Sequence, residues 1–225
     1  MLKDDYPFEL AIESAKECKQ MLVSDAGGPA DGDPMVTVHR KGRVVAMIQV
    51  RNVTGDMRND ALSAARCAIV GWQADRAILI IEGFMREDVV LPDNGELPEL
   101  ERGELGEHFR KNADSDVVEC IVVNEARADG RATMVTLPYH YGEGGALAWR
   151  ESRSEEGDRL EGIMPEALKG FFVERDVLEQ EVRKHWTGEL PDDHAFHRDR
   201  AVANTLTSVG HIVMAAFTGE CTCDD

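Results

Sequence analysis

The chain has 225 residues, of which 43 are Asp or Glu and 25 are Lys or Arg, so its formal net charge is −18 at pH 7. A field of this sign repels phosphate backbones and anionic lipid surfaces, which disfavours nucleic acid and a membrane as partners. No apolar run approaches the roughly 18 residues that cross a bilayer. Five cysteines, an odd number, and an amino-terminal end without a secretory pattern indicate the reducing cytoplasm.

The first elements expected are a helix over residues 7–23, a Gly- and Pro-rich loop over 24–34, and two strands over 35–40 and 43–50. In the helix, apolar residues recur at steps of three and four, which makes one apolar stripe. Lys41-Gly42 joins the strands, and the glycine suits a tight hairpin. Apolar side chains on both faces of these strands predict a sheet that is covered on both sides.

A helix over residues 59–73 and an apolar strand over 77–81 follow. Residues 83–116 contain ten acidic and four basic residues and two prolines, which predicts a long, solvated acidic loop. A second hairpin is expected from strands over 117–123 and 131–137, and Pro138 is expected to end it.

The remaining residues predict a linker or loop over 142–164 and two helices over 165–186 and 200–217. The fold class is therefore α/β (α+β), with a mixed sheet of about five strands flanked by helices. The expected organisation is a sheet domain over 1–141 and a C-terminal helical pair over 165–225 that packs on it.

Common catalytic signatures are absent, including the Walker phosphate loop, H-E-x-x-H, G-x-S-x-G and C-x-x-C. One pattern has an architectural context, namely Asp33 followed by Gln49-Val50-Arg51. The order helix, hairpin, helix, strand over residues 7–82 resembles the core of the PD-(D/E)xK nuclease family. That resemblance implies that Asp33 and Gln49 would hold a divalent cation such as Mg²⁺, with Arg51 stabilising the transition state. The chain departs from the family motif because Gln49 stands where Glu is preferred and Arg51 where Lys is preferred.

Strand register decides whether this site can assemble. A two-residue loop at Lys41-Gly42 puts Asp33 on the face opposite to Gln49 and Arg51, because side chains alternate along a strand. A three-residue loop shifts the register by one and brings the three together. The sequence leaves both alternatives open.

Two further candidates involve metal ligands. His194 and His197 would share one face of a helix and could bind a metal with neighbouring aspartates, although a helix start rich in acids is also typical. Cys221 and Cys223 form a C-x-C near the last residue, where a frayed tail is the alternative.

The sequence favours a non-enzymatic, acidic accessory or interaction protein that acts through protein–protein contacts. The missing catalytic signatures and the acidic loop support this interpretation, and the acidic charge suits a basic protein partner. Self-association through residues 165–186 is a further expectation. A PD-(D/E)xK-type nuclease, active or degenerate, is the alternative.

Overall fold

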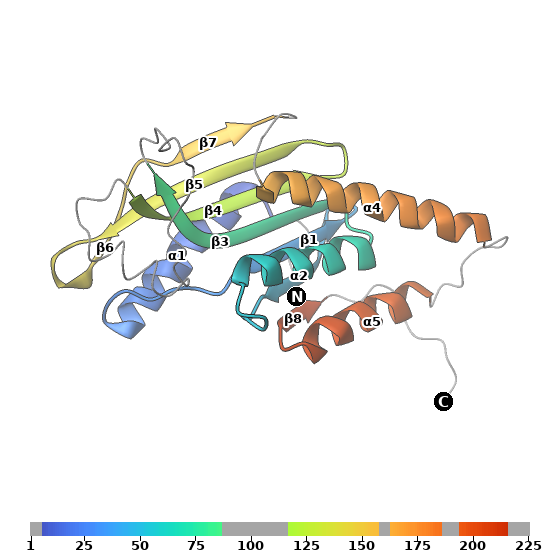
Figure 1. The fold of residues 1–225 in the computed structure, drawn as a ribbon, viewed down its shortest axis with the longest axis horizontal. Helices are drawn as coiled ribbons and strands as arrows, with labels where there is room; N and C mark the ends of the chain where they lie inside the picture. Colours follow the sequence, from blue (N-terminus) through green and yellow to red (C-terminus); the bar gives the residue numbers. More distant parts are fainter. Residues whose placement is uncertain (1–5, 87–116, 158–162, 186–193, 216–225) are drawn as a thin grey trace, which may run out of the picture.

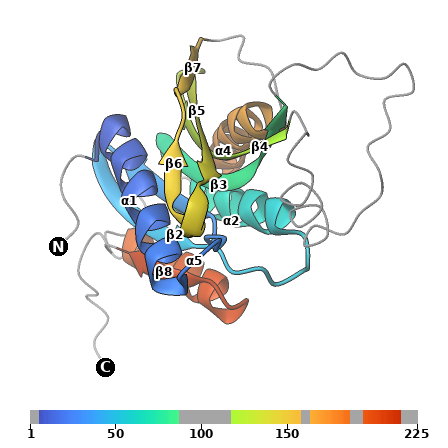
Figure 2. The same cartoon turned by 90° about the vertical axis from the view of Figure 1, so that its left-hand side faces the viewer.

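The computed structural model describes residues 6–86, 117–157, 163–185 and 194–215. In these residues, one sheet separates two helical layers (Figure 1). Helix α1 (Phe8–Ala26) lies on one face, and α2 (Met57–Gly71), α4 (Ile163–His185) and α5 (His194–Ser208) lie on the other. Figure 2, which looks along the sheet, shows α1 separated from α2 and α4 by the strands.

The sheet has eight described strands in the order β6-β5-β4-β3-β1-β2-β8, with β7 paired to β5, and every pairing is antiparallel. The expected mixed sheet of about five strands is therefore wrong in both respects. Helix α2 does connect two strands that run in the same direction, β2 and β3. Strand β1 lies between them and is antiparallel to both, so no parallel pair forms.

Strands β1 (Met35–Arg40) and β2 (Arg43–Gln49) form the first predicted hairpin. Lys41 and Gly42 both have positive φ, at 54° and 75°, which matches the two-residue turn that follows strand twist. The register then shifts, because Val38 pairs with Ala46 whereas His39 pairs with Val44. Val45 is the extra residue of a β-bulge, so the hairpin combines a short turn with the shifted register.

Helix α1 continues three residues beyond its predicted C-terminal end. It is capped by Gly27, which has a φ of 66° that glycine adopts readily. Asp56 caps α2, because its side chain accepts hydrogen bonds from the backbone N–H groups of Arg58 and Asn59. The apolar stripe predicted for α1 is confirmed only in its first half, because Cys18 and Leu22 are exposed and the inner face continues through Lys19 and Val23. Helix α2 turns mainly small side chains inward: Ala61, Ala64, Ala65, Ala68 and Ile69.

Strands β3 (Arg76–Arg86), β4 (Val117–Arg127) and β5 (Ala132–Tyr141) are each longer than predicted. Strand β3 includes the first four residues of the expected acidic loop, whose residues 87–116 lie outside the described chain. Pro138 does not end β5. Its carbonyl oxygen accepts from Arg150 on the outer side, and the nitrogen of a strand residue points to the same side, so Pro138 costs no hydrogen bond to β4.

Two short strands, β6 (Leu147–Trp149) and β7 (Arg153–Glu156), pair with the outer edge of β5. They follow a short 3-10 turn at Glu143–Gly145 and fall in the segment that the sequence assigned to a linker. All four residues of β7 are exposed, so this end of the sheet projects from the body, as Figure 2 shows.

Helix α4 matches its prediction closely, whereas the last predicted helix, over 200–217, is wrong in its extent. Helix α5 begins at His194 and ends at Ser208, and residues 212–215 form strand β8 beside β2. Gly210, with a φ of 96°, lies between them. The helical pair is thus followed by a strand that completes the sheet.

Two core clusters result. The larger lies between the sheet and α2, α4 and α5 around Trp72, and the smaller lies between α1 and strands β3 to β5 around Tyr139. None of the described helices combines the length and the apolar character that a membrane crossing requires.

Candidate binding site

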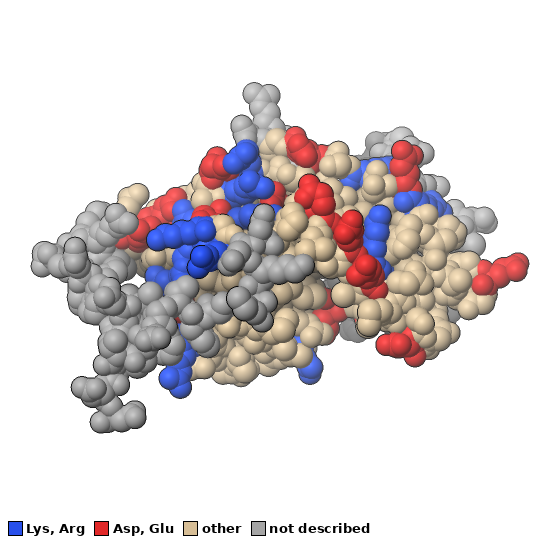
Figure 3. All heavy atoms as spheres, turned by 180° about the vertical axis from the view of Figure 1, so that it is seen from behind, with Lys and Arg blue, Asp and Glu red and all other residues tan. Residues whose placement is uncertain are grey.

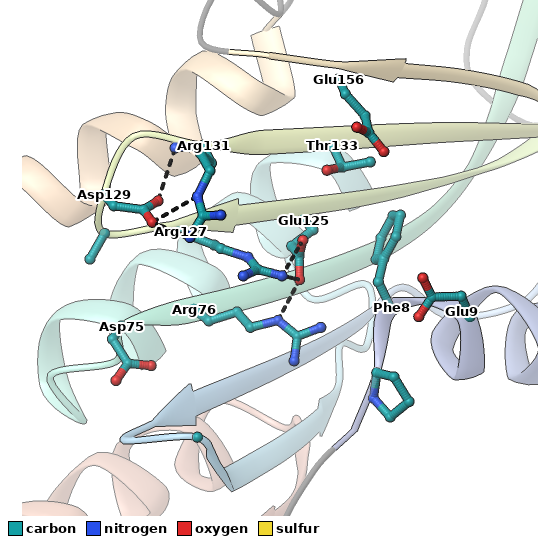
Figure 4. A pocket seen from close by; sticks show the side chains of 13 residues that line it. Phe8, Glu9, Asp75, Arg76, Glu125, Arg127, Asp129, Arg131, Thr133 and Glu156 are labelled. Carbon is teal, nitrogen blue, oxygen red and sulfur yellow. Dashed lines mark hydrogen bonds and ion pairs between the residues drawn. The ribbon is translucent and has the colours of Figure 1, made fainter.

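A hollow of about 800 Å³ lies at the end of the sheet where β3 begins and the β4–β5 hairpin turns (Figure 4). The first turn of α1 closes one side and the β1–β2 turn contributes Gly42. Its charged lining consists of three arginines and five carboxylates: Arg76, Arg127, Arg131, Glu9, Asp75, Glu125, Asp129 and Glu156. The hollow is therefore a polar site with more acidic than basic groups.

Glu125 neutralises two of the arginines. Its side chain is 5% exposed and accepts from Arg76 Nε and, at 3.2 Å, from Arg127 Nη2. Arg76 also donates to the carbonyl oxygen of Tyr6 at 2.9 Å, which ties the segment before α1 to the sheet. Pairing β3 with β4 sets Ile78 opposite Glu125, so Arg76 lies on the same face one step away.

The third arginine is held within the β4–β5 turn. Arg131 Nε donates to Asp129 Oδ2 at 2.8 Å, and the Arg131 backbone N–H donates to Asp129 Oδ1 at 3.1 Å. These hydrogen bonds lower the pKa of Asp129. The guanidinium groups are therefore engaged by carboxylates of the chain itself.

Three carboxylates of the lining lack such a cation. Among the residues that the structure describes, the side chains of Glu9 and Glu156 make no hydrogen bond or ion pair, and Asp75 accepts only from the backbone N–H of Lys41. Figure 4 shows the Phe8 ring between Glu125 and Glu9, with Glu156 reaching in from β7. An aromatic face beside unpaired carboxylates is an environment that suits a cation.

A second polar cluster lies inside the α1 face of the sheet. The Lys19 side chain is fully buried, donates to Glu82 Oε2 at 2.8 Å and to the carbonyl oxygen of Ala30, and lies 4.7 Å from the centre of the Tyr139 ring. Glu82 also accepts from the backbone N–H of Gly32 at 3.0 Å, and a Cβ at Gly32 would come within 2.9 Å of that carboxylate. This cluster fastens the loop after α1 to the sheet.

The chemistry of this cluster is structural. Burial raises the pKa of Glu82, against the opposing effect of Lys19. Burial also raises the pKa of Tyr139 in this cluster. On the opposite face of β4, burial, with the charges of Glu119 and Glu82, raises the pKa of the Cys120 thiol to about 12. A thiol with such a pKa stays protonated at neutral pH and does not act as a nucleophile.

The bulge at Val45 decides how the residues of the nuclease hypothesis lie. Gln49 Nε2 donates to Asp33 Oδ2 at 2.9 Å, so these two meet in an exposed position. Arg51 contributes its backbone N–H to His211 Nδ1 at 3.3 Å, and no described hydrogen bond or ion pair joins its side chain to Asp33 or Gln49. The structure therefore brings Asp33 and Gln49 together, and the Arg51 side chain has no described contact with either.

The histidine pair lies at the start of α5. His197 is exposed, and the side chain of His194 lies outside the described part. Asp199, the nearest described acid along the helix, is fully buried and paired with Arg40 and Arg198. In the described residues no three His, Cys, Asp or Glu side chains cluster as metal ligands. Cys221 and Cys223 lie outside the described chain.

The sequence pattern of residues 117–137 predicts a hairpin and does not indicate the charged lining of the hollow. A signal was present, because Arg76 and Glu125 stand in strands that are otherwise apolar. Their pairing across 49 positions depends on the register of β3 and β4, which the sequence does not specify. Comparison of the chain with models of protein families, with curated proteins and with solved structures finds no match.

Proposed function

We propose that the protein is a non-enzymatic interaction protein whose end hollow receives basic side chains of a partner protein. The main support is that, within the part of the chain that the structure describes, three carboxylates of the lining have no cationic partner, whereas its arginines do have acidic partners. The arginines are engaged by Glu125 and Asp129, while Glu9, Asp75 and Glu156 have no cationic partner among the described residues.

Arginine is the side chain that fits best. Its planar group donates to several carboxylates at once and stacks on aromatic rings. Glu9 and Glu156 approach the hollow from different elements, with Phe8 beside Glu9. The net charge of −18 adds long-range attraction for any basic segment and speeds its encounter.

The other polar groups support binding over catalysis. The exposed Asp33 is hydrogen-bonded to Gln49, the buried Lys19 is paired with Glu82 beneath α1, and burial raises the pKa of the Cys120 thiol. The hollow itself combines carboxylates and guanidinium groups without a Ser, Cys or His among its lining residues. Its chemistry is that of charge recognition.

The test is fluorescence anisotropy with a labelled, arginine-rich peptide at physiological salt. The double variant Glu9→Gln/Glu156→Gln should weaken binding about tenfold, because exposed ion pairs are each worth a factor of up to about five. The matched control is Glu13→Gln/Glu17→Gln, which makes the same change of net charge on the exposed face of α1. Equal losses in the two variants, or no binding by the unaltered protein, would overturn the proposal.

A further inference from the structure

The two edges of the sheet differ sharply in charge. At one edge, β7 consists of Arg153, Ser154, Glu155 and Glu156, all exposed. Charged residues on an edge strand discourage pairing with another chain. At the other edge, β8 contains Ile212, Val213, Met214 and Ala215 and has no charge.

The stretch of sequence without charged residues is much longer than β8. Residues 201–219, nineteen in all, contain no Asp, Glu, Lys or Arg, although 30% of the chain is charged. Within the described part of this segment, large apolar side chains are exposed: Val209 at 48%, Ile212 at 41% and Met214 at 53%. On the rear face, charged side chains crowd the upper part and uncharged surface occupies the lower middle, with a few Lys or Arg side chains at the lower rim (Figure 3).

Among the residues that the structure describes, no strand pairs with the outer side of β8. Just after β2, the Val50 N–H donates to the carbonyl oxygen of Pro34 beside β1, whereas the Arg51 N–H donates to His211 on the β8 side. The backbone N–H and C=O groups of odd-numbered residues at this end of β2 therefore point toward β8. Gln49 pairs with Ile212, and the next residue, Val213, therefore directs its N–H and C=O outward. The same holds for Ala215, and no described strand lies beyond β8.

We propose that β8 pairs with β8 of a second copy of this chain, which joins the two sheets edge to edge. Two copies with a net charge of −18 repel each other over most of their surfaces, and the charge-free segment is where contact avoids that repulsion. A basic partner would instead be drawn to acidic surface. Each copy presents the same strand, so a twofold axis makes the pairing antiparallel, like every pairing in the sheet.

The side chains favour the same arrangement. A register that sets Val213 against Val213 of the second copy places Ile212 beside Met214 of that copy, on one face of the joined sheet. Cross-strand contacts between such apolar residues stabilise a sheet. Helix α4 also exposes apolar residues, Val173 and Val177, but acidic and basic residues surround them in the sequence. Self-association through residues 165–186 stays a prediction, and the proposal places the contact at β8 instead.

Sedimentation velocity of the full chain, from micromolar to millimolar concentration, tests the pairing. A species of twice the 24.9 kDa chain mass should form. Met214→Lys should raise its dissociation constant at least about tenfold. Val177→Lys, at 54% exposure against 53% for Met214, is the matched control on α4 and should leave the constant unchanged.

Hydrogen exchange gives an independent readout. Exchange of the Val213 and Ala215 amides should slow as the concentration of unaltered protein rises, since pairing engages outward-facing amides. A monomer at every concentration, or dissociation by Val177→Lys and not by Met214→Lys, would overturn the proposal. So would a dimer in which these two amides exchange at the monomer rate.

Discussion

Replacing Arg40 by Met should destabilise the protein strongly, because Arg40 neutralises a fully buried carboxylate. Asp199 on α5 has a side chain that is 0% exposed, and it accepts from Arg40 Nη2 at 2.8 Å and Nη1 at 3.2 Å. Arg40 also donates to the carbonyl oxygen of Trp72 at 2.9 Å, and the Trp72 indole donates to the carbonyl oxygen of Asp199. This network joins the β1–β2 hairpin, the end of α2 and α5.

The expected loss is about 3 kcal/mol, near the lower end of the cost of removing one partner from a buried ion pair. The lower end applies because Arg198 still donates to Asp199 at 3.1 Å. With a urea slope of about 2 kcal/mol per molar, the unfolding midpoint should fall by about 1.5 M. Circular dichroism during urea titration measures this shift. Arg66→Met removes an equally direct pair, with Glu174, but on exposed surface, and should leave the midpoint nearly unchanged.

A double variant separates charge burial from packing. Arg40→Met/Asp199→Leu removes both charges, so it should recover much of the stability that Arg40→Met loses. Equal midpoints for Arg40→Met and Arg66→Met would refute the reasoning, since the buried carboxylate would then tolerate the loss of its main partner. A double variant less stable than Arg40→Met would show that the cost comes from side-chain packing.

Two further predictions concern substitutions of single buried side chains. Asn124 is 1% exposed, and neither its Oδ1 nor its Nδ2 has a hydrogen-bond partner in the described structure, so Asn124→Leu should raise the free energy of unfolding by about 1–2 kcal/mol in the same titration. A decrease would show that the amide has a role that the described contacts omit. Burial lowers the pKa of His211 against the opposing charge of Asp60, so the folded state disfavours the imidazolium ion and stability should be lost as pH falls below the unfolded value of about 6.5. His211→Asn should reduce the difference in stability between pH 7.5 and pH 5.5, and an unchanged difference would contradict the assignment.

Side-chain periodicity predicted the elements whose local pattern agrees with their packing. Helices α1, α2 and α4 and the strands β1 and β2 begin and end within a few residues of the prediction. The last predicted helix extended too far because the apolar steps from Val202 to Val213 continue through Gly210 without interruption. The open edge of β2 offers hydrogen bonds to residues 212–215, and a periodic pattern contains no information about such an edge.

The arrangement of the site residues depends on strand register, which is harder to predict from sequence than the position of a helix or strand. Lys41-Gly42 is a two-residue turn, yet the bulge at Val45 sets Asp33 beside Gln49, so neither simple loop length described the outcome. The sequence shows which charged residues are present, but it does not show which of them pair in the hollow. Glu125 could have engaged either neighbour on β3 or β5, and only the observed ladder places Arg76 against it.

The charge distribution keeps the two proposed contacts independent. None of the residues that line the hollow belongs to α5 or β8, and β8 pairs only with β2 among the described strands. Joining two copies at β8 therefore leaves both hollows accessible, each with unpaired carboxylates for a basic segment. A dimer of this kind would engage a partner with repeated basic segments at two points, and two linked contacts bind more tightly than one. Under the two proposals, acidity would have two physical consequences: it would draw basic partners to the hollow, and it would confine self-association to the segment from which charge is missing.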